Sequence, residues 1–293
     1  MSFIRHIHAC NPVVEETFWA LQIDGQVMGW LSPGFAEYLL EHFRIFSLQD
    51  DVVTVNPELK SFDQLSEALA RVAKGLADAG IIPPLMNESY PVTPAGRDAA
   101  VAVIDRVAAA YFGLRSFGQH LNGFVRDGGE ISLWIGRRAR DRLIFPGALD
   151  NMVAGGLPYG ISLSGNLVKE CREEAGMSES LALQARPVGA LSYNRVSHRG
   201  FRPDVLYCYD IELPKEFVPL NTDGEVEEFL LLPINKVMQI VHDSDEFKLN
   251  CNLVIIDFAI RHGYIGPEHA DYLALVNGLR QPSGLLSAIE VSK

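Results

Sequence analysis

The sequence predicts an α+β protein built from two unequal parts, and three observations lead to this prediction. The chain has 293 residues, of which 48% are apolar and 21% are charged, so it is long enough for two modest domains with real cores. Helix-like and strand-like patterns alternate in its first third. After about residue 117 the sequence becomes mainly strand-like. We therefore expect a smaller N-terminal α+β domain over residues 1–115 and a larger domain over residues 116–293.

The elements of the N-terminal part follow from short local signals. In chain order they are a strand pair over 18–33, a helix over 34–43, a helix over 61–80, a proline-rich extended linker over 81–96 and a helix over 97–113. Asp24 and Gly25 supply the turn between the two strands. Ser61 or Asp63 caps the second helix, and Gly80 ends it.

The elements of the larger part are expected from alternation and from turn residues. In chain order they are a hairpin over 123–139, a strand over 149–156, a helix from about 162 to 175, two strands over 188–213 with a long polar loop between them, a strand and a helix over 225–241, a buried helix over 250–263 and a short helix over 269–280. Asp127, Gly128 and Gly129 form the turn of the hairpin, and Pro233 separates the strand from the helix after it. The tail after Gln281 is expected to be loose.

The composition argues against several classes of protein. The formal net charge of −12 does not suit non-specific nucleic-acid binding, which needs a basic surface. A phosphorylated small molecule remains compatible, because a metal and a few local Arg or Lys residues can hold phosphate. No run approaches the roughly 20 apolar residues of a membrane span, and the N-terminus does not resemble a signal peptide. We therefore expect a cytoplasmic protein that binds neither nucleic acid nor membrane.

The cysteines are scattered along the chain without a CxxC spacing: Cys10, Cys171, Cys208 and Cys251. This pattern predicts neither a disulfide framework nor a zinc site. We expect buried, reduced thiols, because free cysteine usually behaves as a small apolar residue.

The helix expected after residue 162 is well delimited in the sequence. Either Ser162 or Ser164 can cap its N-terminus. Gly176 follows the helix, and glycine suits the left-handed conformation with which many helices end. The relative positions of the side chains on this helix can therefore be derived from their spacing.

Three carboxylates gather on one stripe of this helix. Glu170, Glu173 and Glu174 fall within an arc of roughly 100°, because each residue advances a helix by about 100°. Like charges at such spacings cost about 0.2–0.5 kcal/mol per pair. A hard divalent cation such as Mg²⁺ would turn this repulsion into coordination, because it prefers oxygen ligands. An ordinary solvated face with a Lys169–Glu173 ion pair is the alternative.

The stretch from Gly155 to Met177 resembles the Nudix box, the signature of the Nudix hydrolases. That pattern runs Gly, five residues, Glu, seven residues, and then Arg-Glu-apolar-any-Glu-Glu-any-Gly-apolar. The segment KECREEAGM matches the last nine positions, with Lys169 in place of Arg. The first Glu of the pattern is absent, because its position falls on Ile161 or, with a loop one residue shorter, on Ser162. The resemblance implies the Nudix α/β/α sandwich with a mixed sheet.

Three further segments resemble a Nudix subgroup that carries an extra N-terminal domain. They are FGQHLNGFV (117–125), LWIGRRA (133–139) and FPGALDNMVAGG (145–156). The subgroup is related to proteins associated with thiamine pyrophosphokinase, and an apolar residue in place of the first box Glu is usual in it. The resemblance then covers the chain from about residue 16 to about residue 280.

The resemblance implies metal-assisted hydrolysis of a diphosphate that is linked to another moiety, X. Glu173 and Glu174 would be the main ligands of Mg²⁺ or Mn²⁺, with Glu170 assisting or orienting the attacking water. The carbonyl group of Gly155 would be a further ligand. A metal lowers the pKa of a bound water, and a carboxylate then takes the proton.

A distant acidic loop is expected to complete the metal site, because many Nudix enzymes take one more carboxylate from such a loop. Residues 221–229 are the best candidate in this chain. Asp223, Glu225 and Glu227 could each reach the site, and we assign Glu225 to the metal. A solvated acidic turn is the alternative for each of them.

Basic and polar residues are expected to hold the substrate. Two arginine clusters could contact phosphate: Arg137, Arg138, Arg140 and Arg142, and Arg195, Arg199 and Arg202. Arg138 is preferred because it closes a strand near the expected mouth of the site, and arginine suits bidentate contact with an oxyanion. Lys169 is expected beside the box carboxylates as a point charge. His120 and Asn122 would contact the substrate or form a structural hydrogen-bonding pair.

Together these features predict a Mg²⁺-dependent Nudix pyrophosphohydrolase of a small-molecule diphosphate. The subgroup suggests thiamine diphosphate, or its oxidised or otherwise damaged forms, as the substrate. ADP-ribose or a nucleotide sugar is the second candidate. A non-catalytic, diphosphate-binding protein with the Nudix fold is the third hypothesis. The N-terminal domain is expected to cover the mouth of the site or to form a homodimer.

Overall fold

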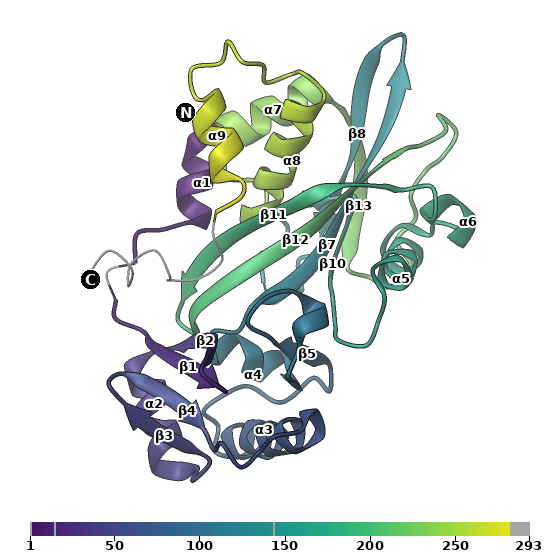
Figure 1. Cartoon of the computed structure of the whole chain (residues 1–293). Coiled ribbons are helices and arrows are strands. Elements are labelled where there is room, and N and C mark those ends of the chain that lie inside the picture. Colours follow the sequence, from purple (N-terminus) through teal and green to yellow (C-terminus); the bar gives the residue numbers. More distant parts are fainter. Residues whose placement is uncertain (1, 15, 143, 282–293) are drawn as a thin grey trace.

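A computed structural model describes residues 2–14, 16–142 and 144–281 of the chain (Figure 1). Helix α1 (Ile4–Cys10) comes first, the elements between residues 19 and 111 gather at one end of the molecule, and the larger part begins at residue 116. Helices and strands are mixed in both parts, which confirms the predicted α+β class. The tail that was expected to be loose lies outside the described residues.

The N-terminal part is built on a four-stranded sheet in the order β2-β1-β4-β3. Its first elements are β1 (Trp19–Ile23), β2 (Gln26–Leu31), α2 (Pro33–His42), β3 (Phe46–Gln49), β4 (Val52–Val55) and α3 (Phe62–Asp78). Asp24 and Gly25 form the predicted turn, with φ of 49° and 74°. The Ser61 side chain caps α3 by accepting from the backbone N–H of Gln64 at 3.2 Å. The strand pair and the two helices that local signals predict are therefore confirmed.

The continuous helix predicted over residues 97–113 is wrong. The structure has instead β5 (Ser89–Val92), a 3₁₀ turn η1 (Arg97–Ala99), β6 (Ala102–Asp105) and α4 (Arg106–Tyr111). Strands β5 and β6 pair antiparallel, so the stretch expected to be a linker contains a strand. The Asp105 side chain accepts from the backbone N–H of Val107 at 2.9 Å and starts α4 there. Strand pairing thus overrides the helix propensity of the alanines in this stretch.

The larger part is a mixed sheet between two layers of helices. The strand order is β11-β12-β7-β8-β13, with β10 paired to β7 and β9 paired to β8. The strands are β7 (Ser116–Asp127), β8 (Glu130–Arg138), β9 (Leu149–Asn151), β10 (Val153–Gly156), β11 (Arg186–Ser197), β12 (Gly200–Glu212) and β13 (Val226–Pro233). The pairing of β7 with β12 is parallel, and the other pairings in this sheet are antiparallel.

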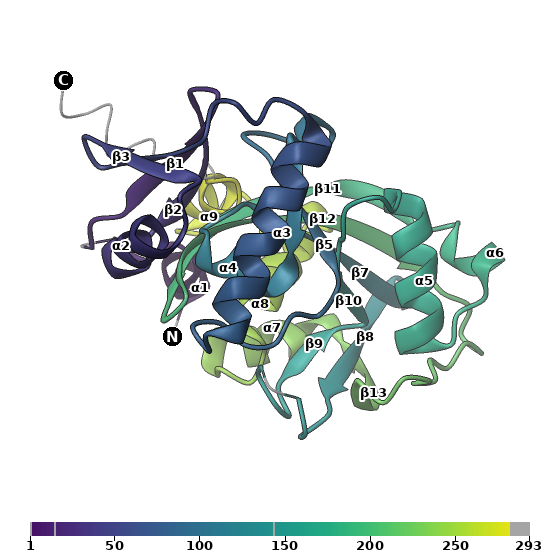
Figure 2. The same ribbon diagram turned by 90° about the horizontal axis from the view of Figure 1, so that it is seen from below.

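Helices cover both faces of this sheet, as the expected α/β/α sandwich requires. One layer contains α5 (Leu163–Ala175) and α6 (Glu179–Ala182). The other contains α1, α7 (Ile234–Asp243), α8 (Leu249–Arg261) and α9 (Tyr272–Gly278). Figure 2, turned by 90°, shows strands β7 and β10 between α5 and α8. The sandwich fold that the resemblance implies is therefore confirmed.

Two details of the sheet differ from the prediction. The single strand expected over 149–156 is divided into β9 and β10 at Met152. The long polar loop expected within 188–213 is wrong, because only His198 and Arg199 separate β11 from β12. Several polar side chains of these two strands line a cavity. A strand that faces a polar cavity lacks the alternation of apolar and polar residues by which a strand is identified in a sequence.

Helix α1 precedes the N-terminal part in the sequence but packs on the larger part. Phe3, Ile7 and Cys10 are buried in the same hydrophobic core as the residues of α8 and α9. Helix α1 contacts α8, α9 and β11. Residues at the start of the chain therefore contribute to the core that supports the sheet.

The structure also describes the cysteines and the lengths of the helices. The four cysteines are buried and free, which confirms the predicted reduced thiols. Within the described ranges, no helix has both the length and the apolar character needed to cross a membrane.

Candidate active site

Helix α5 carries the three glutamates, and both of its ends match signals in the sequence. The Ser162 side chain, rather than that of Ser164, accepts from the backbone N–H of Gly165 at 3.0 Å. Gly176 ends the helix with φ of 61°. A Cβ at Gly176 would lie 2.9 Å from the carbonyl oxygen of Leu220, so both the conformation and the space favour glycine.

Two of the glutamates pack against strand β10. Glu174 is only 7% exposed, and its Oε2 accepts from the backbone N–H of Ala154 at 2.9 Å. Glu170 lies against Gly155, where an added Cβ would be 2.4 Å from the Glu170 Cδ. Glycine at 155 therefore permits a close approach between the strand and this carboxylate. The glycine and the helix of the box meet at this point.

Lys169 bridges the more exposed carboxylates of the helix. Its Nζ is 3.0 Å from Glu170 Oε1 and 3.3 Å from Glu173 Oε2. Burial lowers the pKa of Lys169, but its contacts with the two glutamates outweigh burial and raise that pKa above its ordinary value. The Glu173 side chain is 35% exposed, against 13% for Glu170. The Lys169–Glu173 ion pair thus exists within the carboxylate cluster and does not replace it.

Burial makes the charged forms of Glu170 and Glu174 unfavourable. It raises the pKa of Glu174 to about 8, and the nearby Asp150 and Glu170 carboxylates act in the same direction. Burial also raises the pKa of Glu170 above its ordinary value. A cation bound beside such groups would reverse this preference, because opposite charge stabilises the carboxylate form. The set of oxygen donors therefore fits a divalent cation such as Mg²⁺.

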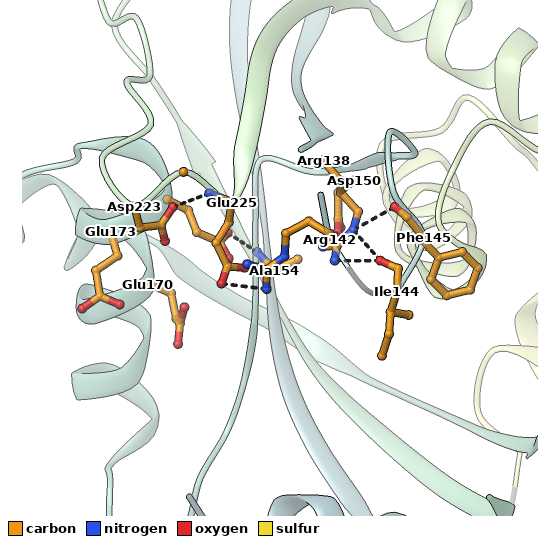
Figure 3. A network of polar contacts seen from close by, with 12 residues as sticks. Arg138, Arg142, Ile144, Phe145, Asp150, Ala154, Glu170, Glu173, Asp223 and Glu225 are labelled. Carbon is orange, nitrogen blue, oxygen red and sulfur yellow. Dashed lines mark hydrogen bonds and ion pairs between the residues drawn. The ribbon is translucent and has the colours of Figure 1, made fainter. Parts of the chain in front are cut away.

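The acidic loop before β13 faces the same space as α5. Figure 3 shows Glu170 and Glu173 on the helix, opposite the loop that carries Asp223 and Glu225. These four side chains and Glu174 line one cavity with a volume of about 330 Å³. The structure thus brings the helix and the distant loop together.

The three carboxylates proposed from the distant loop do not have equal positions. Glu225 lines the cavity, and its Oε1 lies 2.9 Å from a guanidinium nitrogen of Arg142. Glu227 is not among the lining residues and pairs with Arg140 at 3.4 Å. Glu225 and Asp223 therefore face the cavity, and the assignment of Glu225 to the metal stays a prediction, while Glu227 contributes to a surface ion pair.

Arg138 lies on the cavity wall, but its guanidinium is occupied within the protein. It donates to the carbonyl groups of Ile144 and Phe145 at 3.0 and 3.2 Å and to Asp150 Oδ2 at 3.1 Å (Figure 3). These contacts hold the loop after β8 in place. Few N–H donors of Arg138 remain for a phosphate. Arg138 therefore has a structural role, and its contact with the substrate stays a prediction.

His120 and Asn122 take part in a buried chain of hydrogen bonds. His120 Nδ1 lies 2.8 Å from Asn151 Oδ1, and the Asn151 amide donates to Asn122 Oδ1 at 3.1 Å. Asn122 in turn donates to Asp210 Oδ1 at 3.0 Å. Burial lowers the pKa of His120 to about 4, so the ring is neutral near pH 7. Of the two predicted contacts, only His120 lines the cavity.

Sequence reasoning missed a buried charged group beside the cavity. Asp150 accepts from Lys248 Nζ at 3.0 Å, from Arg138 at 3.1 Å and from the Cys251 thiol at 2.7 Å. The ligand atoms of His120, Asp150 and Cys251 lie within 4.8 Å of one another, and these residue types can bind metals. Two cations already neutralise Asp150, however, and they would repel a metal ion. Asp150 lies in a segment of the subgroup resemblance, whereas no local signal pointed to Lys248.

The N-terminal part also reaches this cavity, which no sequence signal indicated. Tyr90 on β5 and Arg106 on α4 are among the lining residues. A Cβ at Gly156 would lie 2.4 Å from Tyr90 Oη and 3.5 Å from Arg106 Cζ. Gly156 therefore allows the N-terminal part to pack directly against β10, beside the box glycine.

The fold and this site define a class of protein. A mixed sheet lies between two helical layers, and glutamates of one helix meet a glycine strand and a distant acidic loop, as expected of a hydrolase that acts on phosphoric anhydrides. Nudix hydrolase 20, chloroplastic, of Arabidopsis thaliana is 45% identical to this chain over 289 residues, which are 95% of this chain and 77% of that protein. The chain belongs to the Nudix hydrolase family.

A second relative agrees with this assignment, and two further comparisons each match part of the chain. Nudix hydrolase 24, chloroplastic, of Arabidopsis thaliana is 45% identical over 282 residues, covering 95% of this chain and 77% of that protein. A family model described as a domain of unknown function, DUF4743, matches residues 2–116. The NUDIX domain of Shewanella oneidensis NrtR, solved with ADP ribose, has 14% identity and a TM-score of 0.41, covering 51% of this chain and 90% of that one.

The comparisons correct the expected location. Both Arabidopsis relatives are named as chloroplastic proteins, which contradicts the expectation of a cytoplasmic protein. That expectation was wrong because it rested on the lack of an apolar run, and plastid targeting segments have no such run. The description of the family model does not mention thiamine pyrophosphokinase, so only the family itself, and not the predicted subgroup, is established.

Proposed function

We propose that this protein is a Mg²⁺-dependent pyrophosphohydrolase that cleaves a diphosphate linked to a moiety X, with Mn²⁺ as an alternative metal. The main supporting observation is the single cavity that Glu170, Glu173, Glu174 and Glu225 line together with Gly155. Carboxylates from two distant segments line one space, where a bound cation would relieve their mutual repulsion. Divalent metals are typical of the Nudix family, and this donor set suits them.

Each residue of the cluster has a role in this proposal. Glu173, Glu174 and the Gly155 carbonyl would hold the cation, and Glu170 would take the proton of the attacking water. When bound, Mg²⁺ neutralises the charge of the diphosphate and lowers the pKa of water. Lys169 would keep Glu170 and Glu173 in position through its two contacts. Neither Ile161 nor Ser162 supplies the carboxylate that the first Glu of the box would provide.

Two classes of X are carried forward for the substrate. Resemblance to the subgroup suggests thiamine diphosphate or its damaged forms. ADP-ribose and nucleotide sugars form the second class, and the cavity supports them through Arg106, Arg195 and Arg202, which line its wall. A cationic heterocycle would meet three guanidinium groups there. We therefore propose the second class as the better fit to the cavity.

The N-terminal domain, which we place within residues 1–115, is proposed to cover the mouth of the site. Tyr90 and Arg106 line the cavity and thus support this role. The alternative role, formation of a homodimer, is tested by light scattering of the purified chain. A monomer with full activity would rule out a need for dimerisation.

The function is tested with the purified chain and a panel of diphosphates. Thiamine diphosphate, an oxidised thiamine diphosphate, ADP-ribose and UDP-glucose are incubated with Mg²⁺ or with EDTA, and the products are separated by chromatography. We expect Mg²⁺-dependent cleavage of the anhydride in the parent and its loss in Glu173→Gln and Glu174→Gln. Glu130→Gln, which removes an exposed carboxylate far from α5 in the sequence, is the matched control.

The outcomes of this panel separate the three hypotheses. Cleavage of the thiamine compounds alone would favour the first class of X, and cleavage of ADP-ribose or UDP-glucose alone would favour the second. If the parent cleaves nothing but still binds these compounds, the protein is a non-catalytic diphosphate-binding protein. If the variants and the parent cleave equally, the assignment of the glutamates is wrong.

A further inference from the structure

Two arginines lie directly opposite each other on neighbouring strands at one end of the cavity. Arg195 on β11 pairs in register with Arg202 on β12, and both line the cavity. Directly opposed residues share a face of the sheet, and like charges in such a pair are destabilising. A pair of this kind needs a compensating anion, either from the protein or from a ligand.

The protein supplies only part of this compensation. Arg202 pairs with Asp204 at 2.9 Å, and Arg106 of the N-terminal part pairs with Glu88 at 2.7 Å. Arg195 has no carboxylate within ion-pair distance in the part of the chain that the structure describes. Three guanidinium groups thus share two carboxylates, and one positive charge faces the cavity without a partner. All of these residues line the same cavity.

Arg195 and Arg202 lie further along the sheet than the glutamates, and Arg106 lies between the two ends, because its Cζ is 3.5 Å from the position of a Cβ at Gly156. Leu206 on β12 pairs with Gly118 on β7, and Gly118 pairs with Gly156 on β10, so these three residues lie at one level of the sheet. Arg202 is four residues further along β12, so its Cα lies about 13 Å from the Cα of Leu206, at 3.3 Å per residue. A diphosphate bound at the glutamates is too short to place its own two phosphates at both ends.

We propose that Arg195, with Arg202 and Arg106, forms a subsite for a second anionic group, a phosphate or a carboxylate, on the moiety X. The substrate is then a diphosphate whose X carries a negative charge remote from the cleaved anhydride. Arginine suits this role, because its planar guanidinium binds phosphate and carboxylate in bidentate fashion. The identity of the substrate depends on the proposed function, but the subsite itself can be tested without turnover.

The first experiment measures anion binding in the absence of metal. Inorganic phosphate is titrated into the protein in EDTA, where the uncompensated glutamates repel anions, and binding is followed by thermal shift and calorimetry. The parent should bind phosphate, and Arg195→Gln should bind it roughly tenfold more weakly, the usual effect of removing a charged hydrogen-bond donor. Arg186→Gln is the matched control, because Arg186 is an exposed residue of the same strand outside the cavity.

Two outcomes of the phosphate titration would overturn the proposal. Equal phosphate affinity in the parent and in Arg195→Gln would exclude the subsite, as would an equal loss in Arg186→Gln. A denaturant titration of each variant shows whether it is folded. The result does not depend on hydrolysis, so a failure of the proposed enzymatic function would leave it valid.

The second experiment asks whether the subsite selects substrates. Each pair of test compounds differs by one remote anionic group: coenzyme A and dephospho-coenzyme A, NADPH and NADH, and UDP-glucuronate and UDP-glucose. The parent should prefer the more anionic member of a pair by about tenfold in kcat/KM, mainly through KM, and Arg195→Gln should remove this preference. A preference that is absent in the parent, or unchanged in the variant, would contradict the assignment of X.

Discussion

A buried carboxylate with few partners is the residue-scale feature on which the site depends. Glu174 accepts one backbone hydrogen bond and lies near two other carboxylates, so burial raises its pKa to about 8. A group in this position costs stability when it is charged, unless a cation is bound. The cost is understandable if the residue serves metal binding, because structural packing alone would favour an apolar side chain.

We expect Glu174→Gln to separate stability from function. The metal-free variant should be as stable as the parent or more stable at pH 8, because a neutral amide of similar shape replaces a desolvated carboxylate. Hydrolysis should fall at least about 100-fold, since a metal that stabilises the reacting charges is worth several kcal/mol. The rise in Tm on adding Mg²⁺ should also disappear. An unchanged Mg²⁺-dependent rise in Tm would contradict the role of Glu174.

Gly155 provides a second test at the scale of one residue. In Gly155→Ala the new Cβ would overlap the Glu170 side chain at 2.4 Å, so this carboxylate must move while the fold is retained. We expect weaker Mg²⁺ binding, measured by calorimetry, and a loss of activity of about tenfold or more, since misplacement of a catalytic group by 1 Å can cost up to about 100-fold. Gly266→Ala is the control, because a Cβ there meets nothing within 4 Å. Equal metal affinity in both variants would contradict the prediction.

At the scale of elements, helix α5 acts as the support for the site. Its first turn is held by the Ser162 cap, and its end is held by the left-handed Gly176. These two limits set which residues of the helix face β10. Caps are local features, which explains why the helix could be predicted closely although its neighbours in space could not.

The cap makes a quantitative prediction. Ser162→Ala should lower the free energy of unfolding by about 1 kcal/mol, because the backbone N–H of Gly165 loses its acceptor. Ser164→Ala is a matched control two residues away, since Ser164 does not cap the helix. Urea denaturation measures both. A larger loss in Ser164→Ala than in Ser162→Ala would show that the cap is assigned to the wrong serine.

At the scale of the whole molecule, the two parts of the chain depend on each other. Helix α1 lies at the start of the chain, but its apolar face packs into the core of the larger part. Tyr90 and Arg106 of the N-terminal part line the cavity that the larger part carries. Residues on the two sides of position 115 therefore contact each other, and a domain boundary at residue 115 stays a prediction.

Helix α1 should matter to the stability of the distant core. Ile7 is 4% exposed, and Ile7→Ala should cost about 2–5 kcal/mol, the usual range for removing a large buried side chain. His8→Ala, at the next and exposed position, should change the free energy of unfolding by less than about 0.5 kcal/mol. Urea denaturation of both variants is the measurement. A fragment over 116–293 that matched the full chain in stability would contradict the role of α1.

Local spacing in the sequence was sufficient to identify the helix of the site and its family. Glu170, Glu173 and Glu174 stand together because a helix places residues three and four apart on one side, and Gly176 marks its end. These relations need no knowledge of the rest of the chain. The hairpin at Asp127 is equally local, since its turn residues adjoin its strands.

The other residues of the site could be identified only from the tertiary structure, because they come from segments that are far apart in the sequence. Arg138 looked available for phosphate, yet its partners Ile144, Phe145 and Asp150 occupy it. Lys248 and Tyr90 carry no motif, and they reach the cavity only through packing. Charge pairing and burial depend on which surfaces meet, and no local pattern encodes this. The family could therefore be read from one helix, whereas the shape and charge of the cavity required the assembled sheet.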